Sequence, residues 1–333
     1  MHRPLHIHGV GHFNPENVID NALLEELDIG TNDAWILERV GIRERRTVLP
    51  LDYIRKTKNA DLRAGQEAAL YTNVDTGRRA ALHAIERAGL SPSDIGMVVA
   101  GGCAPEMSIP SEACRIAAAL DIEAPALDIN SACSSFGAQL HVLGAMAGLP
   151  PYVLVVNPEN TTRVVDYADR ATAVLWGDGT SAAIVSTTEP ARVRISETTL
   201  VSSPAGCAAV EIPRFGHFRQ DGSAVQRFAI KTTRDCVRAL LPSARERTEA
   251  SGGAIRFIGH QANYLMLQSV AKRCEIAPDN HWHNVELLGN TGAAGAPTVL
   301  SQRWDELTDG DSIVLVVVGS GLTWSSMHIE VGS

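Results

Sequence analysis

Cys133 occupies a place in the sequence where a thiol could act as a nucleophile. A short apolar strand is predicted at 125–129, Asn130 and Ser131 indicate a turn, and small and apolar residues at helical spacing follow. A thiol at the start of a helix lies near unpaired backbone N–H groups and the positive end of the helix dipole, and both favour the thiolate. The alternative is a small buried residue, because free cysteine is often buried.

Two later segments place polar side chains at turns. GHQAN at 259–263 follows an apolar run and contains His260, and GNT at 289–291 contains Asn290 and precedes small residues at helical spacing. Both side chains can donate hydrogen bonds to a reacting oxygen. Taken singly, His260 could equally be a core histidine and Asn290 a helix cap.

The composition is typical of a globular chain with a large core. With 333 residues and 45% hydrophobic content, two domains or one core built from two similar halves are expected. The net charge of -9 argues against a nucleic-acid partner. No apolar run reaches the roughly 18–20 residues of a membrane span, and the start of the chain lacks a signal-peptide core, so a cytoplasmic protein is predicted.

The cysteines and histidines indicate neither disulfides nor a metal site. Six cysteines without a C-x-x-C pair are interpreted as reduced thiols. His281 and His283 have the H-x-H spacing of metal ligands, but no third ligand stands near them at a recognised spacing. This segment is therefore interpreted as a polar loop.

Strands and helices alternate along the chain, which predicts an α/β protein. Further strands are predicted at 5–10, 95–100, 152–156, 182–185, 193–200, 208–212, 255–258, 313–318 and 323–331, and helices at 76–88, 111–120, 224–240 and 264–274. Residues 49–73 are predicted to be a surface excursion in which 60–70 could form a helix. The run at 177–179 indicates a hairpin turn. Two similar α/β halves packed as one five-layered body fit this order.

Four motifs in this order resemble the thiolase-fold condensing enzymes, and within them the β-ketoacyl-acyl carrier protein synthase III group. They are the strand, turn and helix around Cys133, GHQAN at 259–263, GNT at 289–291 and GSGLTW at 319–324. Family-like residues also stand at Trp35, Arg39, 41–45, 176–179 and 221–222, so the resemblance covers nearly the whole chain. It implies an α-β-α-β-α thiolase fold in which half 1–186 supplies the cysteine and half 187–333 the histidine and asparagine.

The resemblance also implies the chemistry of the site. Cys133 accepts an acyl group from an acyl-CoA or an acyl carrier protein, and the thioester then undergoes Claisen condensation with a malonyl-type or β-ketoacyl thioester. His260 and Asn290 stabilise the enolate oxygen, and His260 can assist removal of the cysteine proton. No cofactor is implied beyond CoA or phosphopantetheine thioesters as substrates. The tetrahedral oxyanion is held by backbone N–H groups, those of Cys133 and of the loop formed by Gly319, Ser320 and Gly321.

Substrate contacts and assembly follow from the same resemblance. Trp35, Arg39 and Asn263 are implied to bind the substrate. In the family, the segment that precedes the cysteine helix lies at a two-fold dimer interface, and the residue before its proline enters the acyl pocket of the partner. Ile109 takes that place here, so a homodimer is expected. Because isoleucine is smaller than the bulky aromatic of several simple initiators, longer acyl chains are expected to fit.

Three departures from the family pattern favour a specialised relative. Leu265 stands where many members have an arginine, Ser320 stands where glycine is common, and 49–73 is longer than the corresponding region of simple fatty-acid initiators. We therefore expect a role in polyketide or other secondary-metabolite biosynthesis.

Other outcomes stay open at this point. The acyl-enzyme could transfer its acyl group to an alcohol or amine, or two acyl thioesters could condense without decarboxylation. The second reaction normally needs a carboxylate base, and a related head-to-head condensing group has a glutamate where this chain has Ile109, with Glu106 three residues earlier. The non-enzyme alternative is a silent subunit that shapes a chain-length pocket. Retention of Cys133, His260 and Asn290 argues against it.

Overall fold

One mixed nine-stranded sheet forms the framework of the protein, for which a computed structural model describes residues 3–332. Its strand order is β11-β12-β13-β8-β1-β7-β6-β4-β5, and all nine strands were predicted from apolar runs. The first half contributes β1 (Leu5–Phe13), β4 (Met97–Ala100), β5 (Ala126–Asp128), β6 (Val153–Glu159) and β7 (Gly179–Ser186). The second half contributes β8 (Val193–Ser202), β11 (Ile255–Gly259), β12 (Ser312–Gly319) and β13 (Thr323–Val331).

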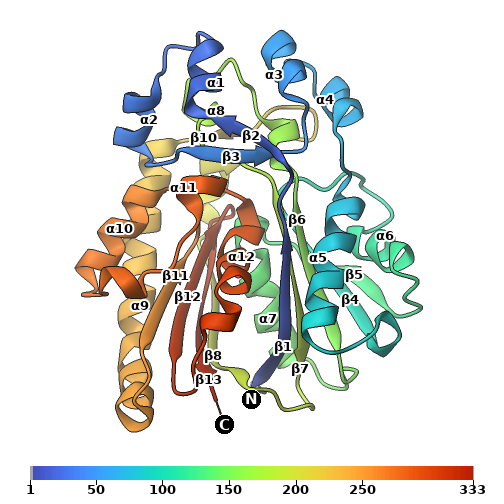
Figure 1. Ribbon diagram of the computed structural model, residues 1–333, viewed down its shortest axis with the longest axis vertical. Helices are drawn as coiled ribbons and strands as arrows, with labels where there is room; N and C mark the ends of the chain where they lie inside the picture. The colour runs from blue at the N-terminus through green and yellow to red at the C-terminus, as the bar shows by residue number, and fades with distance from the viewer. Residues whose placement is uncertain (1–2, 333) are drawn as a thin grey trace.

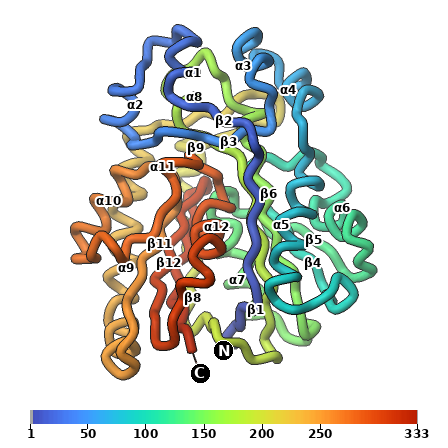
Figure 2. Tube along the Cα trace, in the orientation of Figure 1, coloured from blue at the N-terminus to red at the C-terminus, as the bar shows by residue number. Residues whose placement is uncertain are grey.

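The first strand, β1, joins the two halves of this sheet. It pairs antiparallel with β7 on one side, and its residues 5–7 pair with 193–195 of β8 on the other. Figure 2 shows this strand running through the middle of the molecule, with the two chain ends close together. The division at residue 186 stays a prediction, because β7 ends at Ser186 and β8 begins at Val193 but the sheet is continuous across them.

Helices form three layers around the two halves of the sheet (Figure 1). On the outer face of the first half lie α5 (Asn73–Arg87) and α6 (Glu112–Ala119). On the outer face of the second half lies α9 (Gly222–Ser251), with α10 (Tyr264–Arg273) packed against it. Between the halves lie α7 (Ser135–Ala145) and α12 (Gly295–Gln302), which contact strands of both. The expected α-β-α-β-α order is confirmed.

The two central helices are rich in small and apolar residues because both of their sides are covered. In α12 seven consecutive residues from Gly295 to Ser301 are buried, and in α7 the residues from Ser135 to Leu140 are buried without a polar face. Small side chains at these positions allow strands to approach from two directions. A Cβ at Gly137 of α7, for example, would lie 2.5 Å from the Ser325 side chain of β13.

A set of short elements lies over one end of the sheet, at the top of Figure 1. β2 (Asn17–Asp20) pairs with β3 (Glu44–Thr47) there, and the helices around them are α1 (Asn21–Glu26), α2 (Asp33–Arg39), α3 (Leu51–Thr57), α4 (Leu62–Ala68) and α8 (Arg170–Ala173). The surface excursion predicted at 49–73 therefore contains two helices. Both are largely exposed, so their apolar positions follow no clear period.

Two local predictions were wrong. Residues 177–179 do not form a hairpin between β6 and β7, because Asp178 is buried and accepts hydrogen bonds from the N–H groups of Val48 and Thr162. The strand predicted at 208–212 is only the short β9 (Val210–Glu211), which pairs with β10 (Arg219–Gln220) outside the main sheet. None of the helices within residues 3–332 combines the length and apolarity needed to cross a membrane.

Candidate active site

Cys133 lies in a tight turn between β5 and α7. Residues Ala132–Ser134 form a single 3-10 turn in which Ala132 has a φ of 47°, and α7 begins at Ser135. The Ser135 hydroxyl accepts a hydrogen bond from the Ser131 N–H at 2.9 Å, which closes the turn. Cys133 is only 7% exposed, and it stands two residues before α7, at the positive end of the helix dipole.

The loop that follows β12 packs directly against this turn. A Cβ at Gly319 would come within 2.7 Å of the Ser134 nitrogen, so a side chain at 319 would separate the loop from the turn. The next residue, Ser320, donates a hydrogen bond to the Val210 carbonyl at 2.6 Å. This serine, which departs from the family pattern, therefore ties the loop to β9.

A cavity of about 360 Å³ brings most of the predicted site residues together. Its lining includes Cys133, His260, Asn290, Gly319, Ser320, Trp35, Arg39 and Asn263. Gly321 belongs to the same loop but does not line the cavity. Ile109 lies elsewhere, on the loop before α6, and is 83% exposed. The structure thus assembles groups from both halves around one thiol, and leaves Ile109 outside.

The surroundings of Cys133 favour its thiolate. A hydrogen bond from Cys103 lowers the pKa of the Cys133 thiol, burial acts in the opposite direction, and His260 lowers the pKa further through a hydrogen bond and its charge. His260 is buried at the end of β11, and its Nδ1 has no hydrogen-bond partner among the described residues. The cavity therefore places a thiol with a lowered pKa beside an imidazole, which are groups suited to nucleophilic chemistry.

Asn290 presents its amide to the same cavity. Its Oδ1 accepts a hydrogen bond from the Gly292 N–H at 3.0 Å, so the oxygen is held by the backbone of its own turn. The NH₂ end is therefore the end available to a ligand in the cavity. The hydrogen bond from the Gly292 N–H resembles the helix cap considered from the sequence. It uses only the amide oxygen of Asn290, so the amide NH₂ group can take a second role.

Sequence reasoning missed two residues beside the thiol. The Cys103 sulfur lies 3.4 Å from the Cys133 sulfur, and the Cys103 N–H donates to Glu159 Oε2 at 2.9 Å. Glu159 ends β6 fully buried, and its other oxygen accepts from the Ala293 N–H at 2.7 Å. Burial, with the nearby Cys133 charge, raises the pKa of Glu159 to about 7. An acidic residue at the end of a strand that begins with four apolar residues was the signal available in the sequence.

At the mouth of the cavity two arginines face one tryptophan ring. The guanidinium of Arg39 lies 4.6 Å and that of Arg170 lies 5.1 Å from the Trp35 ring centroid. Asn263 caps α10 through the Met266 N–H and donates to the Arg39 carbonyl at 3.2 Å. Arg170, which sequence reasoning did not single out, adds positive charge to an entrance suited to an anionic, planar group.

Two further cavities continue from Cys133 towards the surface. One, of about 120 Å³, is lined by Cys133, Cys103, Trp176, Phe218 and Ile212 among others. The other, of about 1010 Å³, is lined by Cys103 and Ile212 as well as by the surface residues Met107 and Phe215. The shared lining residues indicate that the three cavities follow one another from the mouth, past the thiol, to the surface at Met107 and Phe215.

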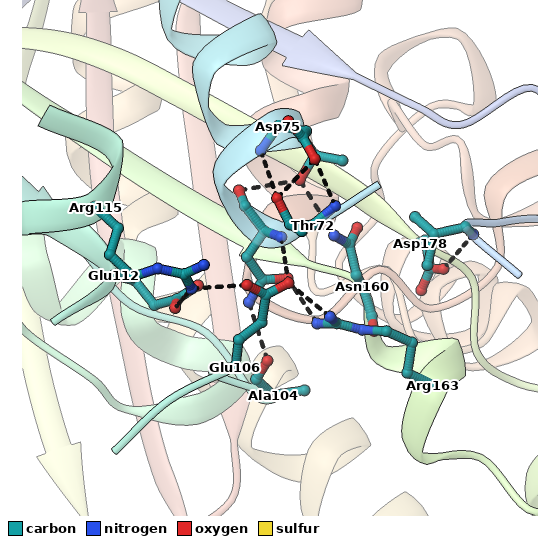
Figure 3. Close-up of polar contacts among 12 residues, drawn as sticks. Thr72, Asp75, Ala104, Glu106, Glu112, Arg115, Asn160, Arg163 and Asp178 are labelled. Carbon is teal, nitrogen blue, oxygen red and sulfur yellow. Dashed lines mark hydrogen bonds and ion pairs between the residues drawn. The ribbon is translucent and has the colours of Figure 1, made fainter. Parts of the chain in front are cut away.

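Glu106, the carboxylate considered from the sequence as a base, has a buried side chain that is held in an ion-pair cluster (Figure 3). Its two oxygens accept hydrogen bonds from Arg163 and Arg115, both at 2.7 Å, and from the Asn73 N–H at 2.6 Å. Burial opposes ionisation, but Arg163 and these bonds hold the pKa of Glu106 below its usual value. The carboxylate therefore stabilises the structure of its loop and is poorly suited to accept a proton as a base.

The five-layered fold, with a cysteine turn leading into its central helix, defines a thiolase-fold condensing enzyme. The family model of 3-oxoacyl-[acyl-carrier-protein] synthase III matches residues 127–204, and the model of its C-terminal part matches residues 251–331. A β-ketoacyl-[acyl-carrier-protein] synthase III of Oceanobacillus iheyensis is 32% identical over 330 residues, which are 97% of this chain and 98% of the relative. The chain belongs to the β-ketoacyl-acyl carrier protein synthase III family of acyltransferases.

Solved structures confirm the thiolase fold. The 3-oxoacyl-[acyl-carrier-protein] synthase III of Aquifex aeolicus superimposes with a TM-score of 0.83 at 28% identity, covering 98% of this chain and 99% of that one. The priming β-ketosynthase of the R1128 polyketide biosynthetic pathway superimposes with a TM-score of 0.79 at 26% identity, covering 99% of this chain and 97% of that one.

Proposed function

We propose that this condensing enzyme carries its acyl group on Cys133 and extends it by decarboxylative Claisen condensation. The observation that carries the proposal is the single cavity in which Cys133, His260 and Asn290 converge beneath the arginine-flanked Trp35. A lowered thiol pKa and two hydrogen-bond donors are what thioester exchange and enolate stabilisation require.

In the first step the Cys133 thiolate attacks the carbonyl carbon of an acyl thioester. The bond to the donor sulfur breaks, and the donor leaves as a thiolate that takes up a proton. The backbone N–H groups of Cys133 and of the loop after β12 hold the tetrahedral oxyanion. Packing of Gly319 against the Cys133 turn supports this role, because the loop and the nucleophile are then fixed relative to each other.

In the second step a malonyl-type thioester loses carbon dioxide and becomes an enolate. His260 and Asn290 donate hydrogen bonds to the enolate oxygen, whose carbon then attacks the Cys133 thioester. Cys133 leaves as a thiolate, and the product is a β-ketoacyl thioester. Two donors aimed at the same developing charge stabilise it because they need no reorganisation when it forms.

The entrance of the cavity is suited to acyl-CoA as the acyl donor. Arg39 and Arg170 supply charge for phosphates, and Trp35 supplies a face for a planar base. An acyl carrier protein, named in the description of the O. iheyensis relative, fits as the carrier of the extender. Leu265, in place of an arginine, weakens the grip on an acidic carrier protein.

A polyketide or other secondary-metabolite setting is the finer proposal. The likeness to the R1128 priming β-ketosynthase supports it, as do the departures at Leu265 and Ser320. A role in fatty-acid initiation is the competing proposal, and the names of the sequence relatives favour it.

Transfer to an alcohol or amine remains the second candidate reaction, since it uses the same acyl-enzyme. Condensation without decarboxylation is less favoured, because Glu106 is ion-paired and Ile109 carries no acid. A silent chain-length subunit is disfavoured by the intact trio of Cys133, His260 and Asn290 in one cavity.

We further propose a homodimer built on the β5 edge. β5 pairs only with β4 within the chain, and the apolar side chains of Leu127, Met107 and Ile109 are 39%, 50% and 83% exposed near it. A second copy of this surface would cover them. Sedimentation that gives a monomer mass at micromolar concentration would contradict the dimer.

Intact-protein mass spectrometry tests the proposal. Wild type mixed with acyl-CoA should gain one acyl mass, Cys133→Ser should gain none, and the exposed control Cys114→Ser should match wild type. Malonyl thioester should then discharge the adduct with release of carbon dioxide and a β-ketoacyl product. Acylation of Cys133→Ser would refute the nucleophile, and discharge only by an alcohol or amine would identify the second candidate reaction.

A further inference from the structure

Cys103 is the group closest to the nucleophile that the proposed reaction does not yet use. It follows β4 through two glycines and places its sulfur 3.4 Å from that of Cys133. It also lines both the 120 Å³ cavity and the 1010 Å³ cavity, so it stands beside the acyl path. A thiol in this place either fills space or acts on the neighbouring sulfur.

Three contacts hold Cys103 in position. Its N–H donates to Glu159 at the end of β6, at 2.9 Å. A Cβ at Gly102 would lie 2.7 Å from the Pro158 carbonyl, so glycine lets this turn approach β6 closely. The Asn130 amide, in the nucleophile turn, donates to the Gly102 carbonyl at 2.9 Å. The two sulfurs are therefore positioned by the same backbone network.

Two thiols this close cannot both ionise, since the second charge would form beside the first. Different groups act on the two thiols: His260 and the backbone N–H of Cys133 favour the Cys133 thiolate, whereas the carboxylate of Glu159 opposes a thiolate at Cys103. The hydrogen bond to Cys133, then burial, then these charges raise the pKa of Cys103. Cys103 therefore keeps its proton while Cys133 gives up its own.

We propose that Cys103 is a positioning residue whose S–H donates a hydrogen bond to the Cys133 thiolate. The inference rests on the proposed function, because it assigns a partner to the sulfur that carries the acyl group. The bond stabilises Cys133 twice, as the attacking thiolate during loading and as the leaving thiolate during condensation. The proton stays on Cys103 throughout, so no further reactant is needed.

The test is the pH dependence of Cys133 alkylation by iodoacetamide, followed by peptide mass spectrometry in the full-length protein. Cys103→Ala should raise the pH of half-maximal rate by about one unit, which slows alkylation about tenfold below that pH. Cys103→Ser keeps an O–H donor and should restore most of the wild-type profile. Cys114→Ala, at an exposed thiol, should change nothing.

An unchanged midpoint in folded Cys103→Ala would overturn the proposal, as would equal midpoints for the Ala and Ser variants, which would indicate packing alone. If Cys103→Ala does not fold, the order in which iodoacetamide labels the two cysteines of the wild-type protein at pH 7 provides the test. We expect Cys133 to be labelled before Cys103, and the reverse order would overturn the assignment. Alkylation needs no acyl donor, so failure here leaves the acyl role of Cys133 standing. Failure of that role would show only in the acylation experiment.

Discussion

Asn290 and Trp176 form a parallel β-bridge that ties the two halves together at the site. The Asn290 N–H donates to the Leu175 carbonyl at 2.8 Å, and the Asn290 carbonyl accepts from the Gly177 N–H at 3.0 Å. A Cβ at Gly177 would lie 2.0 Å from the Leu288 carbonyl, so glycine is needed for this approach. The amide of the second half is thus fixed by backbone bonds relative to the thiol of the first.

Removal of the Asn290 side chain should affect acyl loading much less than carbon–carbon bond formation. Asn290→Ala keeps the backbone bridge, so the protein should fold and retain part of its acyl loading. Carbon–carbon bond formation should fall by roughly two orders of magnitude, as for loss of an oxyanion donor, and His260→Ala should show the same division. Single-turnover assays of loading and condensation measure both steps.

The matched control is Gly177→Ala, which disturbs the bridge and keeps the amide. It should lower the thermal midpoint of unfolding and reduce both steps together. If folded Asn290→Ala instead loses loading and condensation equally, the side chain has a structural role and the oxyanion assignment is wrong.

Glu159 should give the protein a measurable pH dependence of stability. Burial raises its pKa to about 7, so between about pH 4.5 and 7 the folded protein holds a proton that the unfolded chain has released. Its contribution to the free energy of unfolding is therefore present below this window and lost as the pH rises through it. The raised pKa corresponds to about 3 kcal/mol.

Urea unfolding at pH 5 and pH 8 measures this contribution. Glu159→Gln should lose less stability than wild type between the two pH values, although it is less stable at pH 5 because one backbone N–H loses its acceptor. Asp178, whose pKa is also raised, is unchanged in the variant and cancels in the comparison. Glu86→Gln, on the exposed side of α5, is the surface control. If the free energy of unfolding of Glu159→Gln changes between pH 5 and pH 8 as much as that of wild type, the assignment to Glu159 is wrong.

Arg170 should contribute to the binding of CoA thioesters and not to the chemistry. Arg170→Ala removes one of the two guanidinium groups that face Trp35 and should raise the KM for acyl-CoA about fivefold to tenfold, with kcat for loading unchanged. An acyl-pantetheine donor lacks the nucleotide and provides the internal control. Equal losses with both donors would show that Arg170 supports the fold of the entrance instead.

Ile109 should affect chain length only through a partner copy. It is 83% exposed within one chain, so Ile109→Phe should leave folding unchanged and selectively reduce acylation of Cys133 by long acyl-CoAs if the dimer forms as proposed. Each methylene in an apolar tunnel is worth about 0.8 kcal/mol, so two lost carbons cost around tenfold in rate. Acylation profiles from acetyl to long-chain donors measure this, and an identical profile means that other residues such as Met107 end the tunnel.

Sequence patterns predicted the nine strands and the motif residues of the site because each is a local signal. An apolar run indicates a strand, and Cys133, His260 and Asn290 stand in short motifs next to such runs. The contacts between Trp35 and Arg170, or between Cys103 and Glu159, join segments that are distant in sequence, and no local period encodes them. Helix α3 was not predicted for another reason, since its exposed face carries no apolar pattern, whereas α4 lies within the helix considered at 60–70.

The central place of β1 constrains the order in which the chain can fold during synthesis. This strand precedes the other eight strands of the sheet in the sequence, yet it pairs with β7, more than 150 residues later, and with β8 beyond it. Its edges therefore stay unpaired on the ribosome until most of the first half and the start of the second have emerged. Deletion of the first strand should consequently harm the joint between the halves more than the halves themselves.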